Sequence, residues 1–166
     1  MSHDAPELAF HRHRDRALLP EAFLRFIEQV EKEFTPPLSE QHHLPDYVDK
    51  LLRLAEVDYV LDGDEVVAAI ACYANDQEHH QAYATFFGVL PNYRGSGIAR
   101  PLLSMGIESC RQAGMFDLRA RTWHRGRILA FYEEMGFVVE RVETNEWGVE
   151  SLQLTMPLVD RSDHAR

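Results

Sequence analysis

The stretch GVLPNYRGSGIARPLL, residues 88–103, places two glycines and an arginine where the pattern of the chain changes. Before it, the apolar run AYATFFGVL (82–90) is typical of a buried strand, and after it small and apolar residues recur at helical spacing. The stretch therefore predicts a strand followed at once by a helix from Gly97 to Ala113. Pro101 is compatible with this helix because it falls in the first turn, where its missing N–H breaks no hydrogen bond.

This junction suits the binding of a diphosphate. The first four N–H groups of a helix lack intrahelical partners and carry a partial positive charge. Gly95 and Gly97 allow positive φ and close approach of the backbone to an anion, and Arg94 adds a cation with a planar fork. No Gly-Lys-Ser/Thr follows, and residue 100 is arginine where a dinucleotide fingerprint needs glycine. A tight turn in which the glycines serve geometry alone is the other interpretation.

The rest of the chain predicts a mixed sheet covered by helices. Apolar residues spaced by three and four predict two helices between residues 19 and 55, interrupted by FTPPLS (34–39), since proline cannot continue a helix. Two apolar runs around Asp62-Gly63 predict a hairpin, and the run at 82–90 completes an antiparallel meander. Further strands are predicted at 8–13, 116–123, 137–142 and 150–158, and a further helix at 125–135. The expected order is β-α-α-β-β-β-α-β-α-β-β, an α/β (α+β) fold with helices on both faces of the sheet.

Length and composition indicate one globular domain. We expect residues 1–166 to form a single domain, with 159–166 as a flexible tail. Apolar residues make up 45% of the chain, no apolar run approaches a membrane span, and the first residues lack the order of a secretory signal. We therefore expect a cytoplasmic protein without a membrane partner. The net charge of −10 disfavours nucleic acid as a partner.

Cysteine and histidine residues indicate neither disulfides nor a metal site. Cys72 and Cys110 lie in apolar surroundings and are predicted to be buried, inert thiols. The nine histidines include adjacent pairs, but these lack the further spaced ligands of a tetrahedral shell. We expect no bound metal.

Two motifs together resemble the GNAT superfamily of N-acyltransferases. The stretch VLPNYRGSGIARPLL is similar to its acyl-CoA-binding motif, R/Q-x-x-G-x-G/A after a strand ending in V-x-P, with Arg94, Gly97 and Ala99 in the motif positions. About thirty residues later, ILAFYEEMGF resembles its second signature, an A-x-Y helix ending in G-F, which includes Tyr132. The predicted element order also matches that fold. The resemblance implies a V-shaped splay in a mostly antiparallel sheet of six or seven strands.

The resemblance implies acetyl-CoA as co-substrate, bound in the V. Backbone groups at the end of the splayed strand, at Phe87, Gly88 and Val89, would bind the pantetheine arm as an added strand does. Amides of the glycine-rich loop would hold the pyrophosphate; these residues are Arg94, Gly95, Ser96, Gly97, Ile98 and Ala99. Arg125 stands where many members have an asparagine that contacts the cofactor, and we expect it to reach a phosphate.

The resemblance assigns Tyr132 as the general acid that protonates the departing thiolate, although it could also serve in packing alone. A phenol suits this role because its pKa is near 10. Several members use a glutamate on the fourth strand as general base, but AYATFFGV contains no carboxylate. The remaining candidates are water, the loop residues Glu78, His79 and His80, and His124, which follows the fifth strand near the expected cleft.

The reaction implied is direct attack of a primary amine on the thioester. Carboxylates Glu143, Glu146 and Glu150 beside Trp147 favour a small cationic acceptor: an amino sugar, polyamine, amino acid or drug. A protein amine, a non-catalytic acyl-CoA-binding module and an unrelated nucleotide-binding domain are the alternatives. A homodimer is also considered.

Overall fold

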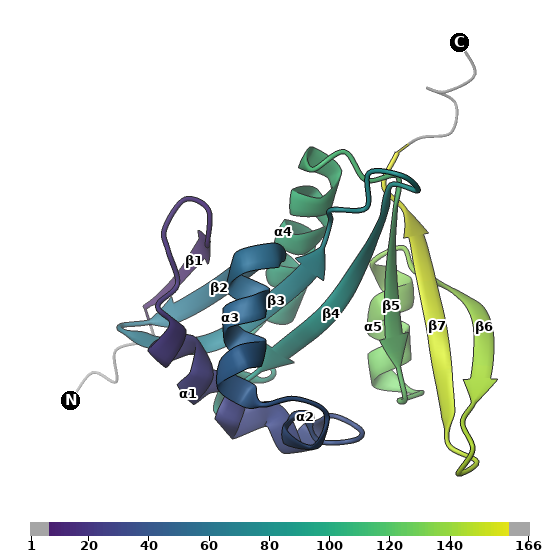
Figure 1. Cartoon of the computed structure of the whole chain (residues 1–166), viewed down its shortest axis with the longest axis horizontal. Helices are drawn as coiled ribbons and strands as arrows, with labels where there is room; N and C mark the ends of the chain where they lie inside the picture. Colours follow the sequence, from purple (N-terminus) through teal and green to yellow (C-terminus); the bar gives the residue numbers. More distant parts are fainter. Residues whose placement is uncertain (1–6, 160–166) are drawn as a thin grey trace.

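A computed structural model describes residues 7–159, and these form one seven-stranded sheet with helices on both faces (Figure 1). The elements in chain order are β1 (Leu8–Arg12), α1 (Pro20–Val30), η1 (Glu31–Glu33), α2 (Leu38–Gln41), α3 (Leu44–Leu54), β2 (Glu56–Asp62), β3 (Glu65–Tyr73), β4 (Gln81–Val89), η2 (Pro91–Tyr93), α4 (Ala99–Gln112), β5 (Asp117–Thr122), α5 (Arg127–Glu134), β6 (Val138–Thr144) and β7 (Glu150–Pro157). The strand order is β1-β2-β3-β4-β5-β7-β6. The predicted fold class is confirmed.

The sheet opens into a V between β4 and β5. This pair alone among the described strands is parallel, and its register runs only from Gln81–Asp117 to Tyr83–Arg119. Beyond Tyr83 the two strands diverge, as Figure 1 shows. The β3–β4 register shifts between Ala71 and Cys72, which leaves Thr85 without a partner. Because a bulge bends its strand, this irregularity helps to direct β4 away from β5.

Helix α4 packs closely on the back of the sheet where small residues interrupt its apolar inner face. Gly106 is buried against Ile70, and a Cβ at Gly106 would lie 2.8 Å from Ile70 Cδ1. Cys110 and Cys72 are both buried, and neither forms a disulfide, as predicted. The hydrogen bond with the Cys110 thiol, and then burial, raise the pKa of Cys72 well above its usual value. The thiols therefore serve packing.

Helices α1 and α3 cover the front of β2–β4 over an aromatic core. Phe86 of β4 contacts the rings of Phe23, Phe26 and Phe34 at centroid separations of 5.2–6.2 Å. The predicted boundaries hold to within a few residues, but Leu19 precedes α1 and is 64% exposed rather than part of its inner face. The short η1, α2 and η2 were not predicted, since segments of three or four residues carry no periodicity.

The sequence also predicted that no segment spans a membrane and that residues 159–166 form a tail. None of the helices within residues 7–159 combines the length and apolar character that a bilayer crossing requires. The predicted tail at 159–166 lies, apart from Val159, outside the described residues.

A buried carboxylate sits between β2 and α4. Asp58 is 1% exposed and accepts hydrogen bonds of 3.0 and 3.3 Å from the Ser109 hydroxyl, while Arg12 Nε lies 3.8 Å away. Burial raises the pKa of Asp58 to about 6, although Ser109 and Arg12 oppose this shift. The folded protein therefore binds a proton here more tightly than the unfolded chain.

We expect Asp58→Asn to stabilise the protein above pH 6. A raised carboxyl pKa stabilises the fold at low pH, and this contribution is lost as pH rises through about 6. The gain should be near zero at pH 4 and reach about 3 kcal/mol at pH 7.5, because one pKa unit corresponds to about 1.4 kcal/mol. Urea unfolding of both proteins across this range measures it, and an equal gain at both pH values would contradict the prediction.

Candidate active site

The loop between β4 and α4 presents a row of unpaired amides. Gly95 and Gly97 have φ of +81° and +84°, the left-handed region that the sequence prediction required. Within residues 7–159, the N–H groups of Gly95, Gly97 and Ile98 donate to no backbone acceptor, and helix α4 begins immediately afterwards at Ala99. Such a concave row at a helix N-terminus is a site for an anion.

The edge of β4 that faces the V also offers backbone groups. Leu90 N–H donates to Val67 O of β3 at 2.8 Å. Since alternate residues direct their backbone groups to opposite edges of a strand, those of Val89 and Phe87 point toward the gap. Val89 O accepts a hydrogen bond from Arg94 Nε at 3.1 Å, which agrees with this direction. The gap therefore has the hydrogen-bonding edge to which an extended amide chain could pair.

Loop and strand edge enclose a hollow of about 270 Å³ with mostly apolar walls. Of the residues predicted to bind the cofactor, Val89, Arg94, Gly95, Gly97, Ile98 and Ala99 line it. Tyr93, Arg100 and Phe131 line it as well and were not predicted. Tyr93 lies inside the motif stretch and could have been included, whereas Phe131 comes from α5, and only the tertiary fold brings it here.

The remaining predicted residues lie around this hollow. Phe87 stacks on Phe131 at 6.3 Å, Gly88 packs near Phe86 and Phe26, and the Ser96 hydroxyl donates to Tyr93 O. Arg125 is exposed and bonds to Glu150 at 3.3 Å, so its guanidinium is held toward the start of β7.

Arg94 is not free in this structure. Its guanidinium bonds to Glu33 of η1 as well as to Val89 O, so a bound diphosphate would compete with both acceptors. Both side chains are nearly half exposed, at 48% and 46%. The ion pair therefore stabilises the protein only weakly.

The resemblance implies that acetyl-CoA binds in this hollow, and Glu33→Gln should then bind it about 2–5-fold more tightly, because the change releases Arg94 and removes a nearby negative charge. Calorimetry at low ionic strength, where screening is least, measures the change. Glu108→Gln is the matched control, since Glu108 is paired with Arg111 and lies well along α4, away from the loop. Equal affinities for the Glu33 variant and the wild type would show that Arg94 does not reach the ligand.

Tyr132 lies on α5 next to Phe131 and is half-buried. Its ring contacts Phe137 edge-on at 5.4 Å, and no residue within 7–159 hydrogen-bonds its hydroxyl. Burial raises the pKa of Tyr132 to about 12, with smaller contributions from Cys72 and Tyr83. The phenol is therefore fully protonated near neutral pH and is a donor rather than a base.

The candidate bases occupy two separate places. His124 is exposed directly after β5, and its backbone N–H bonds to the Thr122 hydroxyl at 3.2 Å. His79 and Glu78 are exposed in the loop before β4, where His79 lies 3.4 Å from Asp76. His80 stacks on Phe116 at the closed end of the V. Of these candidates, only His124 lies at the end of β5 that has diverged from β4. Among the described residues, no group of three potential ligands is arranged for a metal.

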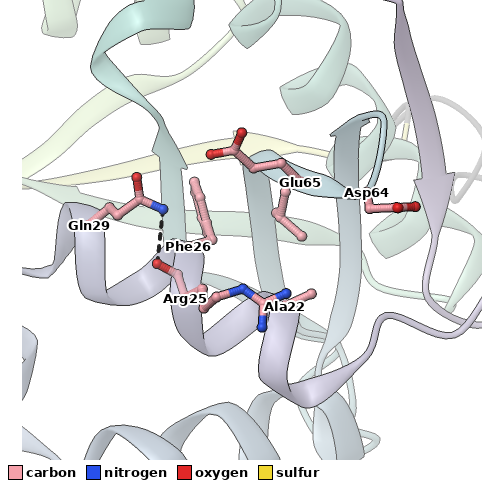
Figure 2. A pocket seen from close by; sticks show the side chains of 7 residues that line it. Ala22, Arg25, Phe26, Gln29, Asp64 and Glu65 are labelled. Carbon is pink, nitrogen blue, oxygen red and sulfur yellow. Dashed lines mark hydrogen bonds between the residues drawn. The ribbon is translucent and has the colours of Figure 1, made fainter.

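A second hollow, of about 300 Å³, lies between α1 and the β2–β3 turn (Figure 2). Its polar side chains are Arg25, Gln29, Asp64 and Glu65, and Gln29 donates to the Arg25 carbonyl at 3.1 Å. None of the predicted site residues lines it. It contains neither the glycine-rich loop nor the open edge of β4.

A sheet that opens into a V beside a glycine-rich loop with unpaired amides is the arrangement that the family resemblance of the sequence implied. The family model described as the acetyltransferase (GNAT) family matches residues 24–137. The chain belongs to this family and is an acyltransferase. No curated protein sequence matches it.

Solved structures share the fold at low sequence identity. A protein from Desulfovibrio desulfuricans assigned to the GNAT family is 22% identical, with a TM-score of 0.73 over 92% of this chain and 99% of that one. The ribosomal-protein-S18-alanine N-acetyltransferase of Escherichia coli is 14% identical, with a TM-score of 0.71 over 92% and 95%. An aminoglycoside 6'-N-acetyltransferase complexed with coenzyme A is 12% identical, with a TM-score of 0.71 over 93% and 98%.

Proposed function

We propose that this acyltransferase moves the acetyl group of acetyl-CoA to a primary amine of a small molecule. The observation that carries the proposal is the set of unpaired amides at Gly95, Gly97 and Ile98 beside the open edge of β4. The amides fit the pyrophosphate, and the edge at Phe87 and Val89 fits the amide-containing pantetheine arm. A structural neighbour was solved with coenzyme A.

The reaction proceeds by direct transfer. A neutral amine attacks the thioester carbonyl, a tetrahedral oxyanion forms, and the C–S bond breaks as the carbonyl reforms. Tyr132 donates its proton to the departing thiolate, and the proton lost by the amine passes to His124 or to water. His124 remains the candidate base because it follows the β5 arm of the V.

A protein acceptor is the second candidate, because one structural neighbour acetylates a ribosomal protein. A cytoplasmic location and a homodimer remain predictions.

The test measures thiol release from acetyl-CoA with a panel of small amines and of peptides with free N-termini. Release with small amines supports the proposal, release with peptides alone favours the second candidate, and an inactive protein that still binds acetyl-CoA contradicts both.

A further inference from the structure

The face of β5 that α1 and α3 leave uncovered indicates which kind of acceptor the protein binds. Along β5, Leu118, Ala120 and Thr122 are buried, so Arg119 and Arg121 point to the opposite face. Register partners share a face, and Arg119 pairs with Tyr83, which pairs with Tyr73 on the front of the sheet. The arginines therefore lie on the front, where α1 and α3 cover only the other half of the sheet (Figure 1).

Arg121 lies at the opening of the V. The pairing of β4 with β5 ends at Tyr83–Arg119, and Arg121 is the next front-facing residue along the diverging strand. The back of the sheet carries α4 and α5 together with the loop at Gly95 and Gly97. A cofactor bound from that side, as the proposed function requires, leaves the front for the amine, which then passes Arg121.

The Arg121 guanidinium lies beside the Trp123 ring and has free donors. It lies over the Trp123 ring at 6.0 Å, and no group within residues 7–159 accepts a hydrogen bond from it. Its nearest carboxylate, Glu143, is 3.7 Å away and lies closer to Arg141, at 2.8 Å. A guanidinium that lies over an indole face makes a cation–π contact, which uses none of its N–H donors and leaves them available for a bidentate partner.

Two of the three carboxylates that the sequence analysis took to favour a cationic acceptor lie next to arginines. Glu143 lies near both Arg121 and Arg141, and Glu150 is bonded to Arg125, so each of these two carboxylates has an arginine partner. Neighbouring Arg119 has a buried Nε without a hydrogen bond, with Asp117 and Glu140 at 3.8 and 3.9 Å. With these carboxylates nearby, the face favours a single negative charge over the double charge of a phosphate.

Resting on the proposed function, we propose that Arg121, positioned by Trp123, binds a carboxylate of the acceptor, which is therefore an amine carrying a carboxylate, such as an α-amino acid. The planar guanidinium edge matches a carboxylate in bidentate geometry. Arg121 thus selects the substrate and takes no part in proton transfer.

Matched pairs of acceptors test this: phenylalanine with phenethylamine, tyrosine with tyramine, and lysine with cadaverine. Thiol release from acetyl-CoA by the full chain should show kcat/KM at least about 10-fold higher for the preferred amino acid than for its decarboxylated partner. Arg121→Gln should abolish that preference by raising the KM of the amino acid about 10-fold, with both kcat and the KM of acetyl-CoA unchanged. Trp123→Leu should raise the same KM about 3-fold.

Arg141→Gln is the matched control, because Arg141 contacts the same Glu143 but lies two strands further from the V. It should keep the preference. Equal turnover of both members of every pair, or an equal loss for both in Arg121→Gln, would overturn the inference. If polyamines or aminoglycosides release thiol and amino acids do not, the inference is wrong and the proposed function stands. If no amine releases thiol although acetyl-CoA binds, both are wrong.

Discussion

Replacing Tyr132 by phenylalanine is expected to lower kcat about 100-fold or more while the affinity for acetyl-CoA stays unchanged. The variant keeps the ring that packs on Phe137 and removes only the hydroxyl, which no described residue binds. Without a donor the thiolate must leave unprotonated, and loss of general acid catalysis costs about 10²–10⁴-fold. Thiol-release kinetics and calorimetry with acetyl-CoA measure the two quantities separately.

Tyr93→Phe is the control for this result. It removes another phenol near the cofactor hollow, but one that donates to Asp62 and whose pKa is raised to about 12 mainly by that bond. The kcat of Tyr93→Phe should differ from that of the wild type by less than about 3-fold, since the Tyr93 hydroxyl already donates its proton to Asp62. A Tyr132 variant with wild-type kcat would leave the residue with a packing role only.

The raised pKa of Tyr132 also determines how the kcat of the wild type should depend on pH. Because burial raises the pKa of Tyr132 to about 12, the phenol stays protonated throughout the usual assay range. We therefore expect kcat to rise with pH as the amine and the base lose their protons, without a descending limb from Tyr132 below about pH 11. A fall in kcat centred near pH 9, absent from Tyr132→Phe, would contradict the raised pKa.

Replacing Gly97 by valine is expected to weaken acetyl-CoA binding about 10–100-fold. No atom lies within 4 Å of a Cβ at this position, so the effect comes from φ of +84° rather than from a clash within the protein. A β-branched residue disfavours this conformation by about 1–3 kcal/mol, and the loop would relax by turning its amides away from the diphosphate. Each 1.4 kcal/mol corresponds to a factor of ten in affinity.

Gly148→Val provides a matched control. Gly148 has φ of +79° and equally open surroundings, but it lies in the β6–β7 turn. Both variants should lose a similar amount of thermal stability, and only the Gly97 variant should lose affinity in calorimetry. Equal affinity in both variants would show that the glycine-rich loop does not hold the cofactor.

The sequence determined the features whose cause is local. Glycine permits the positive φ that Gly63, Gly95 and Gly97 adopt in their turns, and the first turn of α4 tolerates Pro101 because that position needs no N–H. Alternating and helically spaced apolar residues predicted the element order. Two motifs at a fixed separation predicted the family, and the match to the family model confirms it. Each of these signals lies within a few dozen residues of contiguous chain.

The tertiary structure decided what depends on residues far apart in the chain. Arg94 meets Glu33 across 61 positions, and Phe131 reaches the cofactor hollow from another helix. Glu143 and Glu150 read as a free acidic rim in the sequence, yet folding places Arg121, Arg141 and Arg125 against them. The sequence determines only how many charged residues there are. The electrostatic field at a site depends on which opposite charges the sheet register brings within a few ångströms. The family and the acyltransferase class were therefore predictable from the sequence, whereas the charge around the expected acceptor site was not.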